Sequence, residues 1–179
     1  MTALFFISLI AFVLGLAAIA LKYGIPESIS ESYYLLPPKI RLPVFYGWTI
    51  LVAIPLVMFW LNMSEGTAQP LIFFGCAFLV FVGVSAPFKE KGMTNKVHVI
   101  SAGLCALLTQ IWIFIYTPFW VFSLTLVILF AAIGFKTKGA LGGGKTAISS
   151  LTFFLELAAF LSVYIGVYGY YKLHSHGYF

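Results

Sequence analysis

Six apolar stretches, each close to twenty residues long, make up most of this chain. They cover residues 3–21, 44–61, 71–88, 97–116, 119–135 and 148–171. About 20 apolar residues in a helix cross the roughly 30 Å hydrocarbon layer of a bilayer. Only 8% of the 179 residues are charged, whereas soluble domains carry about 25%. The sequence therefore predicts an all-α, polytopic membrane protein in which residues 1–179 form one domain of six transmembrane helices.

The boundary between the fourth and fifth stretches rests on a length argument. Residues 97–135 contain no Asp, Glu, Lys or Arg. As one helix they would measure about 58 Å, which is nearly two bilayers, so the chain must turn within them. Proline disfavours the helical conformation in the residue before it. We therefore expect the turn at Tyr116, Thr117 and Pro118.

The basic residues occupy alternate connections between the apolar stretches. Three follow the first stretch, three the third and three the fifth: Lys22, Lys39, Arg41, Lys89, Lys91, Lys96, Lys136, Lys138 and Lys145. The connections after the second and fourth stretches have none. Because short basic loops stay on the cytoplasmic side, the pattern predicts that the N- and C-termini are both outside. Cations at membrane edges attract anionic headgroups, so we expect membrane lipids, and no nucleic acid, as partners of this chain of net charge +5.

The two cysteines and the first apolar stretch have simple interpretations. Cys76 and Cys105 lie inside apolar stretches and lack the spacing of a metal site or of a secreted disulfide framework. We read them as small core residues, and we expect no metal and no cofactor. Residues 3–21 have no basic segment before them and no convincing cleavage site after them, so we expect a retained helix and not a signal peptide.

Glu156 is the only acidic residue inside a predicted span. A charged group at that depth costs about 2.5–3.5 kcal/mol on insertion scales, so its presence calls for a reason. One interpretation is a structural Glu that is hydrogen-bonded to a neighbouring helix. The other is an acid that titrates or binds a ligand.

A stripe of small and polar residues follows one face of the fourth predicted helix. His98, Ser101, Ala102, Cys105 and Thr109 recur at helical spacing. Small residues allow membrane helices to approach closely, and helix packing explains most of this stripe. His98 adds a polar group that packing does not require.

The long connection after the first helix contains further polar candidates. Pro26 and Glu27 suit the first turn of a short helix, which would place Ser28, Glu31 and Ser32 on one face. This segment is either a solvated connector or a lid over the inner mouth of the bundle. Taken together, the candidate ligand-binding residues are Glu31, Tyr33, His98, Ser101 and Glu156.

Two apparent motifs carry little weight. Residues 139–146 match the phosphate-loop pattern G-x-x-x-x-G-K-T, but that loop works between a strand and a helix, and here it would join two membrane helices. We expect a flexible hairpin there. His174 and His176 are spaced like a metal-binding pair, but they lie in a short tail that we expect to be disordered, and the sequence assigns them no role.

Three short motifs resemble a family of bacterial six-helix membrane proteins of unknown function. The chain has S-I-S-x-x-Y-Y at residues 28–34, H-x-x-S-A at residues 98–102, and Glu156 in the last helix. The resemblance covers most of the chain in order. It implies the six-helix fold, a location in a bacterial inner membrane, and a clustering of these positions, but no activity.

Several functions therefore remain open. The first is an integral membrane protein whose inner-facing polar pocket binds a lipid or another amphiphile. The second is a proton-linked transporter of small molecules in which Glu156 titrates. The third is an intramembrane hydrolase with Ser28, Ser30 or Ser32 near His98. The fourth is a helical scaffold for a second copy of the chain or for another membrane protein.

Overall fold

The computed structural model describes residues 2–87, 89, 92–140 and 146–175. The helices, in order, are α1 (Thr2–Tyr23), α2 (Ser32–Leu35), α3 (Arg41–Met63), α4 (Gln69–Val84), α5 (Gly92–Tyr116), α6 (Trp120–Ala140) and α7 (Thr146–Ser175). No strand occurs among these described residues. The all-α prediction is therefore confirmed.

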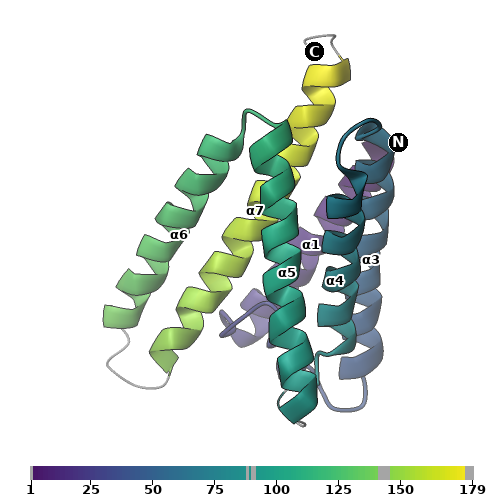
Figure 1. Cartoon of the computed structure of the whole chain (residues 1–179). Helices are drawn as coiled ribbons and strands as arrows, with labels where there is room; N and C mark the ends of the chain where they lie inside the picture. Colours follow the sequence, from purple (N-terminus) through teal and green to yellow (C-terminus); the bar gives the residue numbers. More distant parts are fainter. Residues whose placement is uncertain (1, 88, 90–91, 141–145, 176–179) are drawn as a thin grey trace.

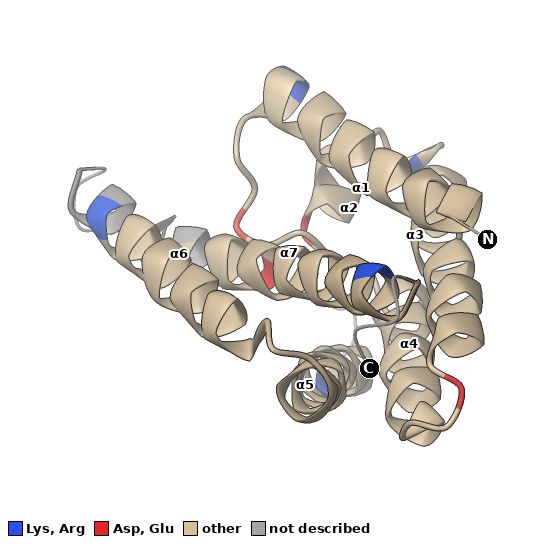
Figure 2. Cartoon of the chain, turned by 90° about the horizontal axis from the view of Figure 1, so that it is seen from above, with Lys and Arg blue, Asp and Glu red and all other residues tan. Residues whose placement is uncertain are grey.

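The long helices run up and down the bundle, and the two chain ends lie at the same end of it (Figure 1). Seen along the bundle, α7 lies between α6 on one side and the other long helices on the other (Figure 2). The charged positions lie mostly at helix ends and connections, with an acidic position within α7 (Figure 2).

Within the described residues, four helices are long and apolar enough to cross a membrane. They are α1, α3, α5 and the part of α7 from Leu151 to Ser175. Two further apolar helices, Gln69–Val84 and Trp120–Lys136, are shorter. The chain thus has the composition and helix lengths of a multi-pass membrane protein.

The predicted corner between the fourth and fifth stretches is confirmed. Helix α5 ends at Tyr116, and α6 begins at Trp120. The Thr117 hydroxyl donates to the Ile113 carbonyl at 2.8 Å and accepts from the Phe119 N–H at 3.2 Å. One side chain thus satisfies main-chain groups on both sides of the turn.

Other boundaries differ from the expectation. Helix α4 ends at Val84 instead of residue 88, and the Ser85 hydroxyl closes its last turn by donating to the Phe81 carbonyl at 2.6 Å. Helix α7 continues to Ser175, so the predicted disorder of the tail is wrong for residues 172–175. Residue 88, His176 and most of the phosphate-loop match, at residues 141–145, lie outside the described residues.

The connector between α1 and α3 is not the helix expected from Pro26. Only residues 32–35 are helical, and the chain before them makes tight turns such as Glu31 N–H to the Ser28 carbonyl at 3.2 Å. The side chains of Ser28 and Ser30 take part in these turns, and serine hydroxyls compete with helix formation in this way.

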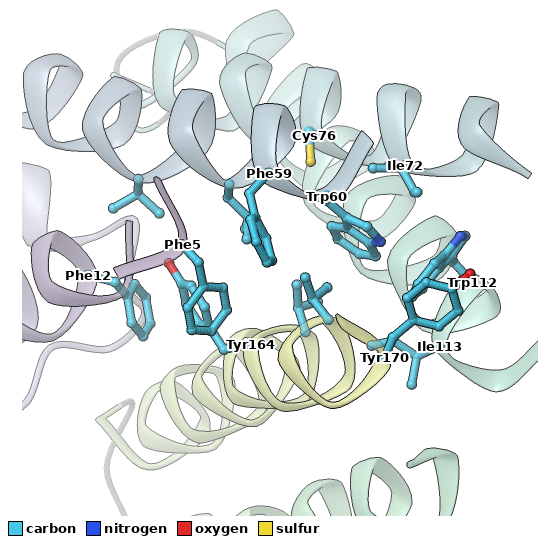
Figure 3. Packing of buried hydrophobic residues seen from close by; sticks show 14 of the residues in the cluster. Phe5, Phe12, Phe59, Trp60, Ile72, Cys76, Trp112, Ile113, Tyr164 and Tyr170 are labelled. Carbon is cyan, nitrogen blue, oxygen red and sulfur yellow. The ribbon is translucent and has the colours of Figure 1, made fainter. Parts of the chain in front are cut away.

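Aromatic side chains fill much of the core (Figure 3). Trp60 of α3 and Trp112 of α5 are fully buried and meet edge to face, with ring centroids 5.1 Å apart. Polar contacts join the same helices: the Ser8 hydroxyl of α1 donates to the Val52 carbonyl of α3 at 2.6 Å and lies 2.7 Å from the Tyr164 hydroxyl of α7. Ser8 has a single proton, so Tyr164 must be the donor in the second bond.

Candidate functional site

The connector between α1 and α3 docks against α7 through main-chain groups. The Ile29 N–H donates to Oε2 of Glu156 at 2.5 Å, and the Phe153 N–H donates to the Glu27 carbonyl at 3.1 Å. Ile29 itself is buried. Glu156 therefore has a protein partner, and that partner is a segment more than a hundred residues earlier in the chain.

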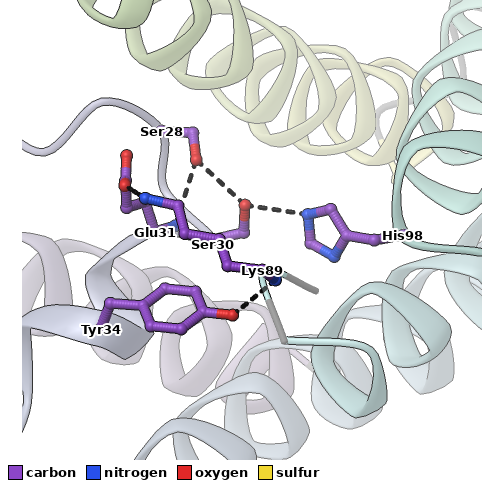
Figure 4. A network of polar contacts seen from close by, with 6 residues as sticks. All are labelled: Ser28, Ser30, Glu31, Tyr34, Lys89 and His98. Carbon is purple, nitrogen blue, oxygen red and sulfur yellow. Dashed lines mark hydrogen bonds and ion pairs between the residues drawn. The ribbon is translucent and has the colours of Figure 1, made fainter. Parts of the chain in front are cut away.

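His98 joins the same connector to α4 and α5 (Figure 4). Its Nε2 lies 3.0 Å from Oγ of Ser30, and its Nδ1 lies 3.3 Å from Oγ of Ser85, where α4 ends. All three side chains are buried, with 4–5% of each residue exposed. The imidazole is thus held by a serine hydroxyl at each ring nitrogen.

The direction of each proton in this group follows from the donors available. Ser85 has one hydroxyl proton, and it goes to the Phe81 carbonyl at 2.6 Å. A ring N–H of His98 also donates to the Val82 carbonyl in the last turn of α4, so the ring proton lies on Nδ1, the nitrogen that faces Ser85, and Nε2 of the neutral ring is an acceptor. The network therefore assigns the Nδ1–H tautomer to His98, and Ser30 donates its proton to Nε2.

Further contacts hold the outer side of the connector. Oγ of Ser28 lies 3.1 Å from Oγ of Ser30 and accepts from the Glu31 N–H at 3.1 Å. Glu31 forms an ion pair with Lys89, and the Lys89 N–H donates to the Tyr34 hydroxyl at 2.7 Å. These contacts, drawn in Figure 4, tie the connector to the link between α4 and α5.

The sequence-predicted candidates therefore divide into two groups. Glu156 and His98 contact the connector, and Glu31 is a part of the connector that pairs with Lys89. Tyr33 is buried elsewhere: its ring packs edge to face on Phe45, and the Arg41 guanidinium lies 5.3 Å from the ring centroid. Ser101 is buried on α5, one helical turn from His98, and it is not among the described residues that hydrogen-bond to Glu156 or line the cavity.

A cavity of about 260 Å³ lies between the connector and the helices α1, α3, α4, α5 and α7. It is neither fully enclosed nor a groove on the surface. Its lining is mostly apolar, and the polar or charged groups at one end are Ser30 and Glu156. On α3 the lining runs from Phe45 to Trp60, which are about 22 Å apart along a helix axis at 1.5 Å per residue.

Trp60 lies at the other end of this cavity. Within the described residues its Nε1 is a buried donor that has no hydrogen-bond partner. The ring of Trp112 stands edge to face with it, and Trp112 in turn donates to the Thr67 hydroxyl at 3.3 Å. The two ends of the cavity therefore differ: one has hydrogen-bonding groups in a network, and the other has an indole in an aromatic cluster.

Sequence reasoning missed two of the residues that shape this site. Ser85 stands near the end of an apolar stretch, where a serine usually signals only a helix terminus, and Trp60 stands at the end of another, where a tryptophan usually signals only the membrane interface. Ser30 was one of three equivalent serines. Of the three connector serines, the fold places the hydroxyl of Ser30 against His98.

The structure shows no group of three or more His, Cys, Asp or Glu side chains placed to hold a metal ion, in the part of the chain that it describes. Cys76 and Cys105 are free thiols, and both line the cavity. No protein-family model matches the chain, and no similar protein was found among curated proteins or solved structures.

Proposed function

We propose that this chain is a bacterial inner-membrane protein that binds a single-chain, uncharged amphiphile in the cavity between its helices. The observation that carries the proposal is the cavity itself: an apolar space that extends along α3 and has hydrogen-bonding groups at one end. The alkyl chain would lie toward Trp60, and the headgroup would lie beside Ser30 and Glu156.

The size of the cavity favours an amphiphile with one alkyl chain over a lipid with two. Pockets for small molecules are commonly about 300–1,000 Å³, and the cavity here is about 260 Å³. A phospholipid with two acyl chains would need far more room. The lining is long relative to this volume, which suits an unbranched chain.

The charges around the cavity favour an uncharged headgroup. Among the described residues that line it, Glu156 is the one charged type, and none is Lys or Arg. A fatty-acid carboxylate would bring a second acid next to Glu156 without a cation to compensate it. A hydroxyl group can donate to the oxygens of Ser30 and Glu156 without that cost, and an ester group adds no charge of its own.

The proposed topology is six membrane crossings with both termini outside. The two chain ends lie at the same end of the bundle, as an even number of crossings requires (Figure 1). Helix α6 has 21 residues, about 31 Å, whereas α4 has 16 residues, about 24 Å, and a helix shorter than the hydrocarbon layer is accommodated by local thinning of the bilayer. In this orientation the connector and the polar end of the cavity face the cytoplasm.

Binding is better supported than proton-linked transport. Helix α3 continues through Pro55, although transporters often build their sites from broken helices. Gln110 is held between helices, because its side chain accepts from the Ser123 hydroxyl of α6 at 2.5 Å and donates to the Ala159 carbonyl of α7 at 3.5 Å.

The test is quenching of tryptophan fluorescence by an unbranched alcohol with bromine on its last carbon. In lipid nanodiscs, saturable quenching is expected, because the bromine would reach Trp60. Trp60→Phe should remove most of the saturable part, whereas Trp120→Phe, on a helix that does not line the cavity, should leave it.

A matched pair of variants separates the cavity from the lipid-facing surface. Ala106→Leu places a larger side chain in the cavity lining. It should weaken the affinity for the bromoalcohol, read from the quenching curve, by tenfold or more, which is about 1.4 kcal/mol or above. Gly103→Leu, where an added Cβ meets open space, should leave the affinity unchanged. Quenching that does not saturate, or that survives Ala106→Leu at wild-type affinity, would contradict the proposal.

A further inference from the structure

Ser30 lies at the polar end of the cavity with His98 behind it, an arrangement that suits nucleophilic catalysis. We infer that Ser30 is a nucleophile and His98 its general base, and that together they cleave an ester of a single-chain amphiphile seated in the cavity. This inference rests on the proposed binding function and adds a reaction to it. It uses residues from the connector, α4 and α5 that the fold brings together.

The first support is the geometry of the pair. Ser30 Oγ lies 3.0 Å from His98 Nε2, within the hydrogen-bonding range that a nucleophile and its base require. Ser30 lines the cavity, whereas His98 does not. The hydroxyl can therefore meet a ligand in the cavity while the base stands behind it.

The second support is the direction of the protons. The nearest acceptor for the Ser85 hydroxyl is the Phe81 carbonyl, and the Val82 carbonyl accepts from the imidazole, so the ring proton lies on Nδ1 beside Ser85 and Nε2 can take a proton from Ser30. Ser85 is thus a positioning residue, in the place that a carboxylate fills in many serine hydrolases. A neutral oxygen there stabilises an imidazolium less than a carboxylate does, so we expect slow turnover.

The third support is a main-chain donor next to the nucleophile. The N–H of Ile29, the residue before Ser30, already donates to an oxygen of Glu156 at 2.5 Å. A carboxyl oxygen resembles the oxyanion that forms when a hydroxyl adds to an ester carbonyl. The Ile29 N–H is therefore a donor for that oxyanion once the Glu156 side chain turns aside.

The reaction balances without an oxidant or reductant. As Ser30 Oγ bonds to the ester carbonyl carbon, its proton passes to His98 Nε2. The carbon–oxygen bond to the alcohol breaks, and the leaving alcohol takes that proton. Water then attacks the acyl-serine and gives one proton to His98, which returns it to Ser30 Oγ as the carboxylic acid leaves.

The experiment uses a fluorophosphonate that carries one unbranched alkyl chain, applied to the full chain in nanodiscs. An activated serine displaces fluoride and gains a phosphonyl group, which intact mass and peptide mapping locate. We expect modification at Ser30, none there in Ser30→Ala, and a rate at least 100-fold lower in His98→Asn, since general-base catalysis contributes about 10²–10⁴-fold. The Ser32 hydroxyl donates to the Ile29 carbonyl and not to His98, so the Ser32→Ala variant should still be modified at Ser30 at close to the wild-type rate.

Bromoalcohol quenching on each variant reports whether the cavity remains formed, so a folding defect is recognised separately. Wild-type quenching without modification of Ser30 would overturn the reaction and leave the binding function standing. Absence of both would overturn both. Modification of Ser30 that is independent of His98, or modification at another serine, would also overturn the inference. Release of a carboxylic acid from a p-nitrophenyl alkanoate, lost in Ser30→Ala, would extend the result from labelling to turnover.

Discussion

His98 Nε2 on α5 lies 3.0 Å from Oγ of Ser30 in the connector, a residue 68 positions earlier in the chain. The other ring nitrogen lies 3.3 Å from Ser85 at the end of α4. One imidazole therefore holds three segments together in a buried place. Because buried polar groups are nearly always hydrogen-bonded, these contacts predict which ring nitrogen of His98 carries the proton.

The first prediction concerns the tautomer of His98. We expect the proton on Nδ1 and a lone pair on Nε2, because the Val82 carbonyl accepts from the ring and the nearest acceptor for the Ser85 proton is the Phe81 carbonyl. Nitrogen-15 chemical shifts of histidine-labelled protein would distinguish the two ring nitrogens. His98→Asn identifies the signal by its loss. A protonated Nε2 with a bare Nδ1 would show that the proton directions are reversed.

The second prediction concerns the bond between Glu156 and the connector. Glu156→Leu removes the acceptor for the Ile29 N–H, and the bond to a carboxylate is worth about 1.5–3 kcal/mol. Hydrogen exchange at Ile29 should therefore speed up by about 10- to 100-fold. Glu156→Gln keeps a carbonyl oxygen in nearly the same place and should change exchange far less. Equal effects of the two variants would mean that the negative charge, and not the hydrogen bond, holds the connector.

The third prediction is that the ion pair between Lys89 and Glu31 contributes little to stability. The Lys89 side chain is 48% exposed and the Glu31 side chain 12%, so solvent screens the pair from the lysine side, and pairs at the surface are worth about 0–1 kcal/mol. Lys89→Ala should lower the free energy of unfolding by less than about 1 kcal/mol, as measured by denaturant titration in detergent. It keeps the main-chain bond to Tyr34. A loss several times larger would show that this pair anchors the connector.

The fourth prediction concerns the close contact between α6 and α7. A Cβ on Gly134 would lie 2.9 Å from Cα of Leu151, and backbone at that distance cannot move without separating the helices. Gly134→Ala should therefore destabilise the protein, although alanine favours a helix by about 0.5–1 kcal/mol over glycine. Gly103→Ala, with no atom within 4 Å of the added Cβ, should be neutral or stabilising. Thermal unfolding of the pair in one detergent gives the comparison.

The fifth prediction tests the proposed orientation. Lys39→Cys lies in a basic connection and Glu65→Cys in the connection after α3, and both positions are exposed. An impermeant maleimide added to intact cells should label the variant at 65 and not the variant at 39. The wild-type chain is the blank, since Cys76 is buried and Cys105 is partly buried. Labelling of both variants, or only of the variant at 39, would contradict six crossings with the termini outside.

Much of the fold could be predicted from the chain, because its main signals are local. Runs of apolar residues indicate helices, and the Thr117–Pro118 step ends one of them where expected. The end of α4 was placed too late, because the apolar stretch was followed to residue 88 although Pro87 disfavours helix before it, and the hydroxyl of Ser85 turns back to the helix.

The site was less accessible to sequence reasoning, because it depends on contacts between distant segments. The polarity of His98 and Glu156 marked them as candidates, but nothing local shows that both meet one connector. Ser101 shares the helical stripe of His98, yet a spacing along one helix does not show which neighbour a side chain faces. Tyr33 was grouped with them by proximity in sequence, and it turns instead to Phe45.

Helix α6 supplies no residue to the cavity wall. It nevertheless returns the chain from the turn after α5 to the opposite end of the bundle, where α7 begins (Figure 1). Without that return α7 would start at the wrong end, and Glu156 would lie far from Ile29. Helix α6 therefore determines which residues of α7 can reach a ligand, although α6 itself touches none. A change in the length or direction of α6 would displace the cavity residues of α7 as surely as a change in the lining.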